Sequence, residues 1–86
     1  MRRNEIYDKL KGILQGSQFL LSDETLSILD ENTSFIYDLV FDSIQILELF
    51  ITMEEEFGIV CEPNDLNVEL FDKVGSLLDF LEKKLA

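Results

Sequence analysis

The sequence predicts a small all-α protein, a four-helix bundle with a long loop between its first two long helices and a short third helix. Two observations lead to this class. Apolar residues recur at helical spacing over residues 3–15, 43–57 and 73–85. The chain has 86 residues, which suits one small domain and leaves no room for a second, and 47% of them are hydrophobic, which is enough for a core. We therefore expect a single domain over residues 1–86.

The first predicted helix runs from Arg3 to Gln15. Asn4 is a suitable N-cap residue, and Gly16 follows the last residue of the apolar pattern. The apolar face consists of Ile6, Leu10, Ile13 and Leu14. Most of the positive charge of the chain lies on this helix, and we expect it to form a solvated face: Arg2, Arg3, Lys9 and Lys11.

Residues 16–41 form a long connection, and loops beyond about 15 residues usually carry function or short structure of their own. A helical turn is expected at Thr25–Leu29, capped by Ser22 or Asp23, and a further turn at Asp30–Ser34. Apolar residues should anchor the connection on the bundle: Phe19, Leu20, Leu21, Leu26, Ile28, Leu29, Phe35, Ile36 and Leu39.

The central predicted helix, residues 43–57, has both of its ends encoded locally. Asp42 is a favoured N-cap residue, and Gln45 lies three positions later, where a capping-box partner reaches back. Gly58 suits the position that follows the last turn of a helix. Ser43 then falls on the first turn, where we expect its hydroxyl to be exposed.

This central helix has more apolar residues than one buried face requires. One stripe should be buried: Ile46, Leu49, Phe50, Met53 and Phe57. A second stripe lies beside Ser43 and should be partly exposed: Ile44, Leu47 and Ile51. Acidic residues border it: Asp42, Glu48, Glu54 and Glu55. Apolar contacts edged by carboxylates indicate a docking face for a partner, although the second stripe could instead pack on the long loop.

The C-terminal part predicts a short third helix or turn within residues 62–70, in which Pro63 suits the first position. Asp72 is expected to cap a last helix, Lys73–Leu85, in which Lys83 and Lys84 suit the negative end of the helix dipole. Cys61 stands among apolar residues, where a small buried hydrophobe is a better interpretation than a reactive thiol.

Negative charge dominates the chain, which has a formal net charge of −11. Between Lys11 and Lys73 there is no Lys or Arg, whereas 14 of the 18 acidic residues fall there. Such a surface repels phosphate backbones and anionic lipids, so neither nucleic acid nor a membrane is expected as a partner. It favours proteins with basic patches, unless the acidity serves only solubility.

The residue types exclude several kinds of chemistry. There is no histidine and only one cysteine, which removes Ser-His-Asp and Cys-His nucleophiles and any His/Cys zinc site. Three consecutive glutamates, residues 54–56, point in three directions on a helix, so we expect no metal site there. An enzyme acting alone is therefore not expected. Without a secretory signal or a long apolar run, the expected location is the cytoplasm.

Residues 38–44, Asp-Leu-Val-Phe-Asp-Ser-Ile, together with Glu48-Leu49 and the run Glu-Glu-Glu-Phe-Gly-Ile at 54–59, resemble the modification site and second helix of acyl carrier proteins. The family pattern is Asp-Leu-Gly-x-Asp-Ser-Leu. Val40 replaces its glycine and Ile44 its leucine, and neither change removes the serine hydroxyl. More weakly, the resemblance extends over nearly the whole chain.

The resemblance implies a bundle of acyl-carrier type in which Ser43, flanked by Asp42, receives a 4′-phosphopantetheine arm from coenzyme A. A separate phosphopantetheinyl transferase would attach the arm with magnesium. The arm's thiol would then hold acyl groups as thioesters for acyl-transferring or synthase enzymes with basic docking patches. The carrier itself is expected to be a monomer and not an enzyme.

The pathway stays open at this stage. Fatty-acid synthesis is the first interpretation, and polyketide or other lipid-modifying pathways follow. An aminoacyl, peptidyl or D-alanyl carrier shares the Glu-Glu-Glu-Phe-Gly-Ile ending of the helix. Outside the family, a non-catalytic helical adaptor would keep Ser43 as a mere helix-start residue. A hydrolase with Ser43 as nucleophile lacks a histidine base.

Overall fold

The computed structural model describes residues 2–16, 19 and 21–86, and in these residues the chain is all-helical, without a strand. The all-α class is confirmed. The elements are α1 (Arg3–Leu14), α2 (Asp23–Ile28), α3 (Ser43–Phe57), η1 (Pro63–Asp65), η2 (Val68–Phe71) and α4 (Val74–Leu85), where η denotes a 3-10 turn.

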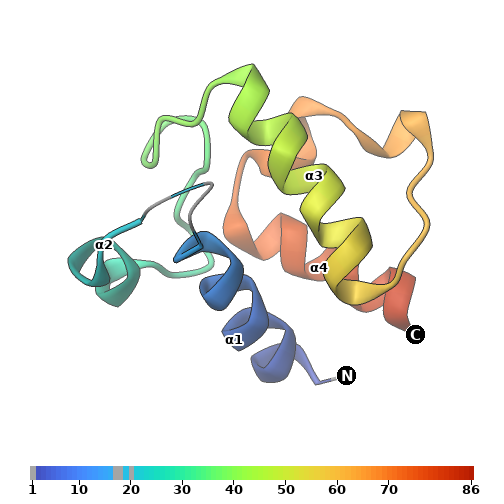
Figure 1. The fold of residues 1–86 in the computed structure, drawn as a ribbon, viewed down its shortest axis with the longest axis horizontal. Coiled ribbons are helices and arrows are strands. Elements are labelled where there is room, and N and C mark those ends of the chain that lie inside the picture. Colours follow the sequence, from blue (N-terminus) through green and yellow to red (C-terminus); the bar gives the residue numbers. More distant parts are fainter. Residues whose placement is uncertain (1, 17–18, 20) are drawn as a thin grey trace.

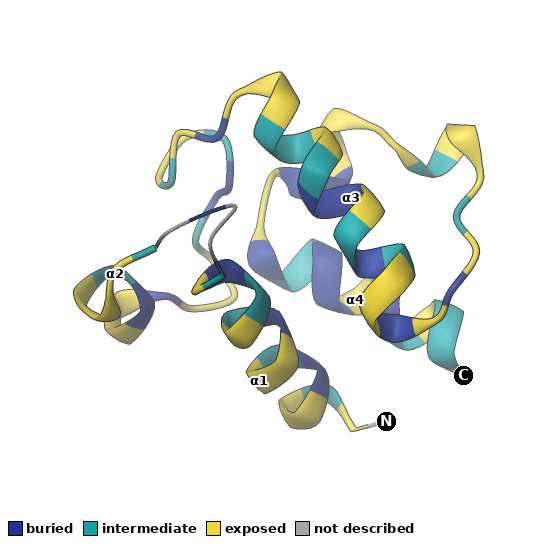
Figure 2. Cartoon of the chain, viewed as in Figure 1, coloured by how far each residue is buried: buried dark blue, intermediate teal, exposed yellow. Residues whose placement is uncertain are grey.

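The three long helices surround one hydrophobic core. α1 packs against α4, and α4 also packs against η2 (Figure 1). Each helix turns a buried stripe inward and an exposed face outward (Figure 2). The innermost side chains come from all three long helices and from the segment before α4, and they include Ile6, Leu10, Leu49, Met53, Phe71, Leu77 and Leu81.

The start of α1 differs from the prediction. Arg2, not Asn4, is the N-cap residue, and the Glu5 carboxylate accepts a hydrogen bond of 2.9 Å from the Arg2 N–H. Glu5 is the third residue of the helix, and its carboxylate satisfies the N–H of the N-cap residue. The N-cap position itself therefore does not need a short polar side chain. The buried face agrees with the apolar pattern, with Ile6, Leu10 and Leu14 inside.

Most of the apolar residues predicted to anchor the long connection pack into the hydrophobic core or against it. Phe19, Leu26, Leu29 and Phe35 are buried, and Leu21, Ile36 and Leu39 are half-buried. Ile28 is exposed, so this anchor was predicted wrongly, and Leu20 lies outside the described residues. The expected helical turn is α2, and Ser22 is its cap because its side chain accepts a hydrogen bond from the Thr25 N–H.

The region between α3 and α4 holds two 3-10 turns instead of one short α-helix. Pro63 occupies the first position of η1, as predicted. Asp72, however, does not cap α4, whose N-cap residue is Lys73 without a side-chain hydrogen bond. The first N–H groups of α4 find backbone acceptors in the distant α2–α3 loop. Val74 donates to the Thr33 carbonyl at 2.8 Å, and Gly75 donates to the Glu31 carbonyl at 2.9 Å.

Arg3 joins three parts of the fold, which corrects the prediction of a solvated basic face. Its guanidinium donates to the carboxylates of Glu31 in the α2–α3 loop and of Asp79 and Glu82 on α4. As a result, the Arg3 side chain is only 32% exposed. Lys9 is also engaged, since its ammonium donates to the Glu56 carbonyl and lies over the ring of Phe57.

Arg3→Ala should lower the free energy of unfolding by about 1–2 kcal/mol, because exposed ion pairs contribute below about 1 kcal/mol each and three meet here. The hydrogen bond from Arg3 holds the pKa of Glu31 below its usual range. A lowered pKa stabilises the fold at neutral pH, and this contribution is lost as the pH falls through the folded-state value. The difference between wild type and variant in urea unfolding should therefore shrink below about pH 4. A difference independent of pH would contradict this role of Glu31.

Candidate functional site

Ser43 is the first residue of α3, and the helix begins as the sequence indicates. The Asp42 carboxylate accepts a hydrogen bond from the Gln45 N–H at 2.8 Å, and the Gln45 side-chain oxygen accepts one from the Asp42 N–H at 3.0 Å. Gly58 ends the helix in the left-handed conformation, with φ of 63°. The capping box fixes the first turn, and the exposed Ser43 stands on it.

The loop that leads to Ser43 is held by a local hydrogen-bond network around the buried Ser34. The Ser34 hydroxyl oxygen accepts from the N–H groups of Ile36 and Tyr37. The Asp38 carboxylate accepts from the Ser34 N–H at 2.7 Å, and the Phe41 N–H donates to the Phe35 carbonyl at 2.9 Å. Four such contacts within eight residues leave the segment before Ser43 little freedom.

Aromatic side chains fasten the same loop to the core. The Phe41 ring stacks on Phe19 with centroids 5.7 Å apart, and it lies 5.8 Å from the ring of Phe35. Phe35 in turn meets Phe71 edge to face, and Phe71 meets Phe50 on α3 in the same way. The start of α3 is thus held from the loop and from the core together.

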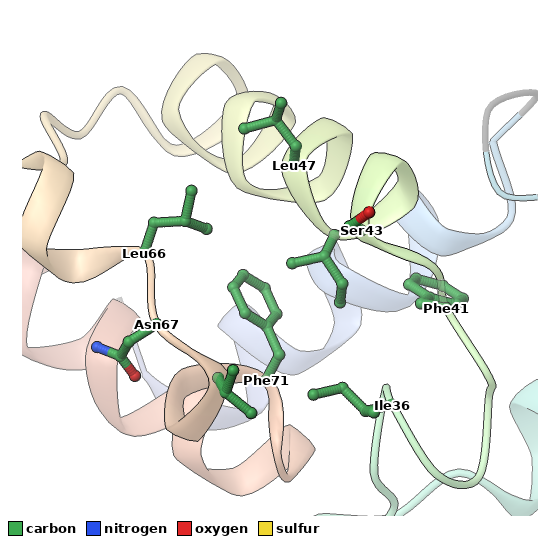
Figure 3. A pocket seen from close by; sticks show the side chains of 9 residues that line it. Ile36, Phe41, Ser43, Leu47, Leu66, Asn67 and Phe71 are labelled. Atoms are coloured by element: carbon green, nitrogen blue, oxygen red, sulfur yellow. The ribbon is translucent and has the colours of Figure 1, made fainter.

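Beside Ser43 lies an apolar groove with a volume of about 380 Å³ (Figure 3). α3 forms one side and the η1–η2 segment faces it, as Leu47 and Leu66 show in Figure 3. The lining is Ile36, Phe41, Ser43, Ile46, Leu47, Leu66, Asn67, Val68 and Phe71. Only Ser43 and Asn67 contribute polar side chains, so the groove favours an apolar ligand.

The second stripe of α3 is exposed, as predicted. Ile44 is 67% exposed, and Leu47 and Ile51 are 46% exposed. Four of the five residues of the other stripe, Leu49, Phe50, Met53 and Phe57, are buried, while Ile46 is half-buried in the groove wall.

Of the acidic residues predicted to border the second stripe, two have partners within the fold. Asp42 caps α3, and one oxygen of the Glu54 carboxylate accepts from the Cys61 N–H at 3.1 Å. Glu48 is half-buried and Glu55 is exposed. Cys61 is half-buried, and burial, helped by the Glu54 charge, raises the pKa of its thiol. This environment agrees with the interpretation of Cys61 as a packing residue.

Sequence reasoning missed two features of the site. Leu66, Asn67 and Val68 complete the groove from the far side, and no local pattern marks them, because only the fold brings them opposite α3. Val40 has φ of 55°, a left-handed conformation that costs an L-residue roughly 1–2 kcal/mol. The family pattern has glycine at this position, and glycine readily adopts a positive φ, so the sequence did indicate a left-handed residue here.

The residues around Ser43 fit a covalently bound phosphodiester. Ser43 is exposed, and its hydroxyl makes no hydrogen bond with any other residue that the structure describes. The first N–H groups of a helix have no partner inside it. The Asp42 carboxylate accepts from Gln45 and the Asp42 carbonyl from Ile46, so the N–H groups of Ser43 and Ile44 remain for an anion. The positive end of the α3 dipole therefore favours an anion there, although the Asp42 carboxylate opposes this effect.

The described part of the chain offers neither a metal site nor a membrane-spanning helix. No group of three His, Cys, Asp or Glu side chains there could hold a metal ion. Nor does any of its helices combine the length and the apolar character needed to cross a membrane.

Residues 20–81 match the family model described as phosphopantetheine attachment site. The chain therefore belongs to the family of phosphopantetheine-carrying proteins, the acyl carrier proteins, which hold a covalent 4′-phosphopantetheine group and are not enzymes. This confirms the resemblance seen in residues 38–59.

Individual relatives cover between 62% and 100% of the chain. It is 36% identical over 83 residues to an acyl carrier protein of Thermotoga maritima, with 96% of this chain and 95% of that one covered. It is 36% identical over 86 residues to an acyl carrier protein of Thermosynechococcus vestitus, covering 100% and 99%. An acyl carrier protein of Bradyrhizobium sp. ORS 278 is 47% identical over 53 residues, 62% of this chain and 65% of that one.

Proposed function

We propose that this chain is a single carrier domain that carries acyl groups in fatty-acid, polyketide or related lipid biosynthesis in the cytoplasm, with the arm attached at Ser43. The observation that carries the proposal is the position of Ser43, exposed at the start of α3 and on the rim of an apolar groove. When bound, the arm supplies a thiol that holds the acyl group as a thioester.

Attachment requires the Ser43 hydroxyl to displace one half of the coenzyme A pyrophosphate. The Ser43 oxygen forms a bond to the phosphorus next to pantetheine, the pyrophosphate P–O bond breaks, and adenosine 3′,5′-bisphosphate leaves. The hydroxyl proton goes to a base of the transferase, because this chain has no histidine and the adjacent Asp42 carboxylate is engaged as the cap of α3. The chain contributes a fixed, exposed nucleophile and the positive end of α3.

The apolar groove favours a fatty acyl cargo over an aminoacyl one. Burying a charged ammonium group among Ile46, Leu47 and Phe71 would cost hydration energy without an acidic partner in the lining. Each buried methylene group of an acyl chain would instead stabilise the complex by about 0.8 kcal/mol. The D-alanyl or aminoacyl carrier is thus the second candidate.

The experiment has two stages. Incubation with coenzyme A, magnesium and a promiscuous phosphopantetheinyl transferase should add one arm to the chain, measured by intact mass. A protein that gains no mass would be a helical adaptor. The modified protein should then melt at a higher temperature when loaded with octanoyl than with acetyl or D-alanyl groups. Equal melting temperatures would show that the groove does not bind the acyl chain and would contradict the preference for a fatty acyl cargo.

Partner enzymes with basic patches are proposed to dock on the second stripe of α3, which is Ile44, Leu47 and Ile51, with Asp42, Glu48, Glu54 and Glu55 around it. Apolar contacts would hold the complex, and the carboxylates would speed the encounter. The carrier is proposed to do this as a monomer, which leaves the stripe free for successive enzymes.

Glu48→Lys should slow acyl transfer from a partner synthase at low salt by reducing the association rate, about tenfold in kcat/KM. The defect should shrink as salt rises, because the Debye length falls from about 30 Å at 0.01 M to about 8 Å at 0.15 M. Glu24→Lys on α2 makes the same change in net charge away from α3 and is the control. Equal defects in the two variants would contradict a localised docking face.

A further inference from the structure

Val40 adopts a strained conformation that its surroundings impose. Its φ of 55° is the only positive value at a non-glycine residue in the described parts of the chain. The hydrogen bonds around Ser34 and the buried ring of Phe41 fix the backbone on both sides of it. A β-branched residue is poorly suited to this conformation. A valine that is kept here despite the strain suggests that its side chain has a role.

Packing does not supply that explanation. The Val40 side chain is 74% exposed, so burial inside the fold repays little of the strain. Two more large apolar side chains near it in the chain are exposed as well, Tyr37 at 75% and Ile44 at 67%. These three exposed apolar residues lie within six positions of Ser43 in the chain, and the acidic residues Asp38 and Asp42 alternate with them.

Any enzyme that modifies Ser43 must come close to Val40. Three peptide bonds separate Val40 from Ser43, so their Cα atoms are at most about 11 Å apart. A standard protein interface buries about 800 Å² on each partner, which is a round patch of roughly 16 Å radius. A transferase centred on the Ser43 hydroxyl therefore reaches Val40.

We propose that Val40 is a specificity-determining residue for the attaching transferase, which buries its side chain when it modifies Ser43. This inference rests on the proposed attachment at Ser43. The transferase is favoured over later enzymes because it alone must act at the Ser43 oxygen, whereas later enzymes act at the far end of the arm. The matching surface on the transferase is an apolar patch with basic side chains that face Asp38 and Asp42.

The test compares Val40→Ala and Val40→Gly with the wild type, using the phosphopantetheinyl transferase of the same organism, coenzyme A and magnesium. Both variants should show a loss of about tenfold in kcat/KM for arm attachment, mostly through KM. This is the size expected when the group that fills an apolar pocket of the enzyme loses its methyl groups. Neither should unfold at a lower temperature, because alanine and glycine suit a left-handed residue at least as well as valine.

The matched control is Val60→Ala. Val60 is 79% exposed but lies beyond the far end of α3, whose 15 residues span about 22 Å from Ser43. This variant should be modified at the wild-type rate. Acetyl transfer to the arm of the already modified Val40→Ala protein should also be unchanged.

Two results would overturn the inference while leaving the proposed function intact. One is a wild-type rate of attachment in both Val40 variants. The other is an equal loss in the Val60→Ala control or in acetyl transfer to the modified protein, which would make the effect general. A wild-type protein that accepts no arm at all would instead refute the proposed function, on which the inference rests.

Discussion

Ser43→Ala is expected to abolish attachment of the phosphopantetheine arm. The exposed hydroxyl of Ser43 is the proposed nucleophile, and alanine offers no oxygen to form the phosphodiester bond. After incubation with coenzyme A, magnesium and a transferase, the wild type should gain the mass of one arm and the variant none. Its helical circular dichroism should be retained, because the cap of α3 comes from Asp42 and Gln45.

The control for this experiment is Ser27→Ala. Ser27 is also an exposed serine on a helix, but it lies on α2, away from the groove. This variant should accept one arm at the wild-type rate. If Ser43→Ala still gained an arm, the attachment residue would be a different hydroxyl, and the proposed role of the groove would fail with it.

The element that the sequence predicts best is α3, whose observed bounds agree with the predicted residues 43–57. Both ends depend on contacts within three or four residues: the reciprocal bonds of Asp42 and Gln45, and the left-handed Gly58. Such contacts can be recognised from spacing alone. The same holds for the exposure of the second stripe, because helical periodicity separates the two faces.

The start of α4 could not be predicted in this way. Its first N–H groups bond to the carbonyls of Thr33 and Glu31, about forty residues earlier, so no nearby side chain marks the cap. A Cβ on Gly75 would lie 3.1 Å from the Glu31 carbonyl oxygen, which explains the glycine there. The role of Arg3 depends on the same meeting of distant segments. Local patterns contain no information on such pairings.

The groove beside Ser43 likewise depends on residues that are distant in the sequence. Its inner wall comes from the apolar pattern of α3, but Leu66 and Val68 lie in irregular backbone or a 3-10 turn. The sequence could therefore indicate a serine on an exposed first turn, but not the apolar groove next to it.

A pair of α3 variants should separate the core from the docking face. Leu49 is fully buried, and Leu49→Ala should lower the free energy of unfolding by roughly 2–5 kcal/mol. Ile51, two residues later, is 46% exposed and does not line the groove, so Ile51→Ala should cost only about 1 kcal/mol. Urea unfolding of both variants measures these differences.

Acyl transfer should be affected more by Ile51→Ala than by Leu49→Ala, the reverse of the order for stability. Transfer of an acyl group from a partner synthase, measured per folded molecule, should fall about tenfold for Ile51→Ala, because the partner loses an apolar contact. It should change little for Leu49→Ala under conditions in which that variant is folded. Ile51 gives a cleaner comparison than Leu47, because Leu47 also lines the groove and could affect the acyl chain directly. If Ile51→Ala left transfer intact and destabilised the fold as much as Leu49→Ala, the second stripe would belong to the core, and the docking face would have to lie elsewhere.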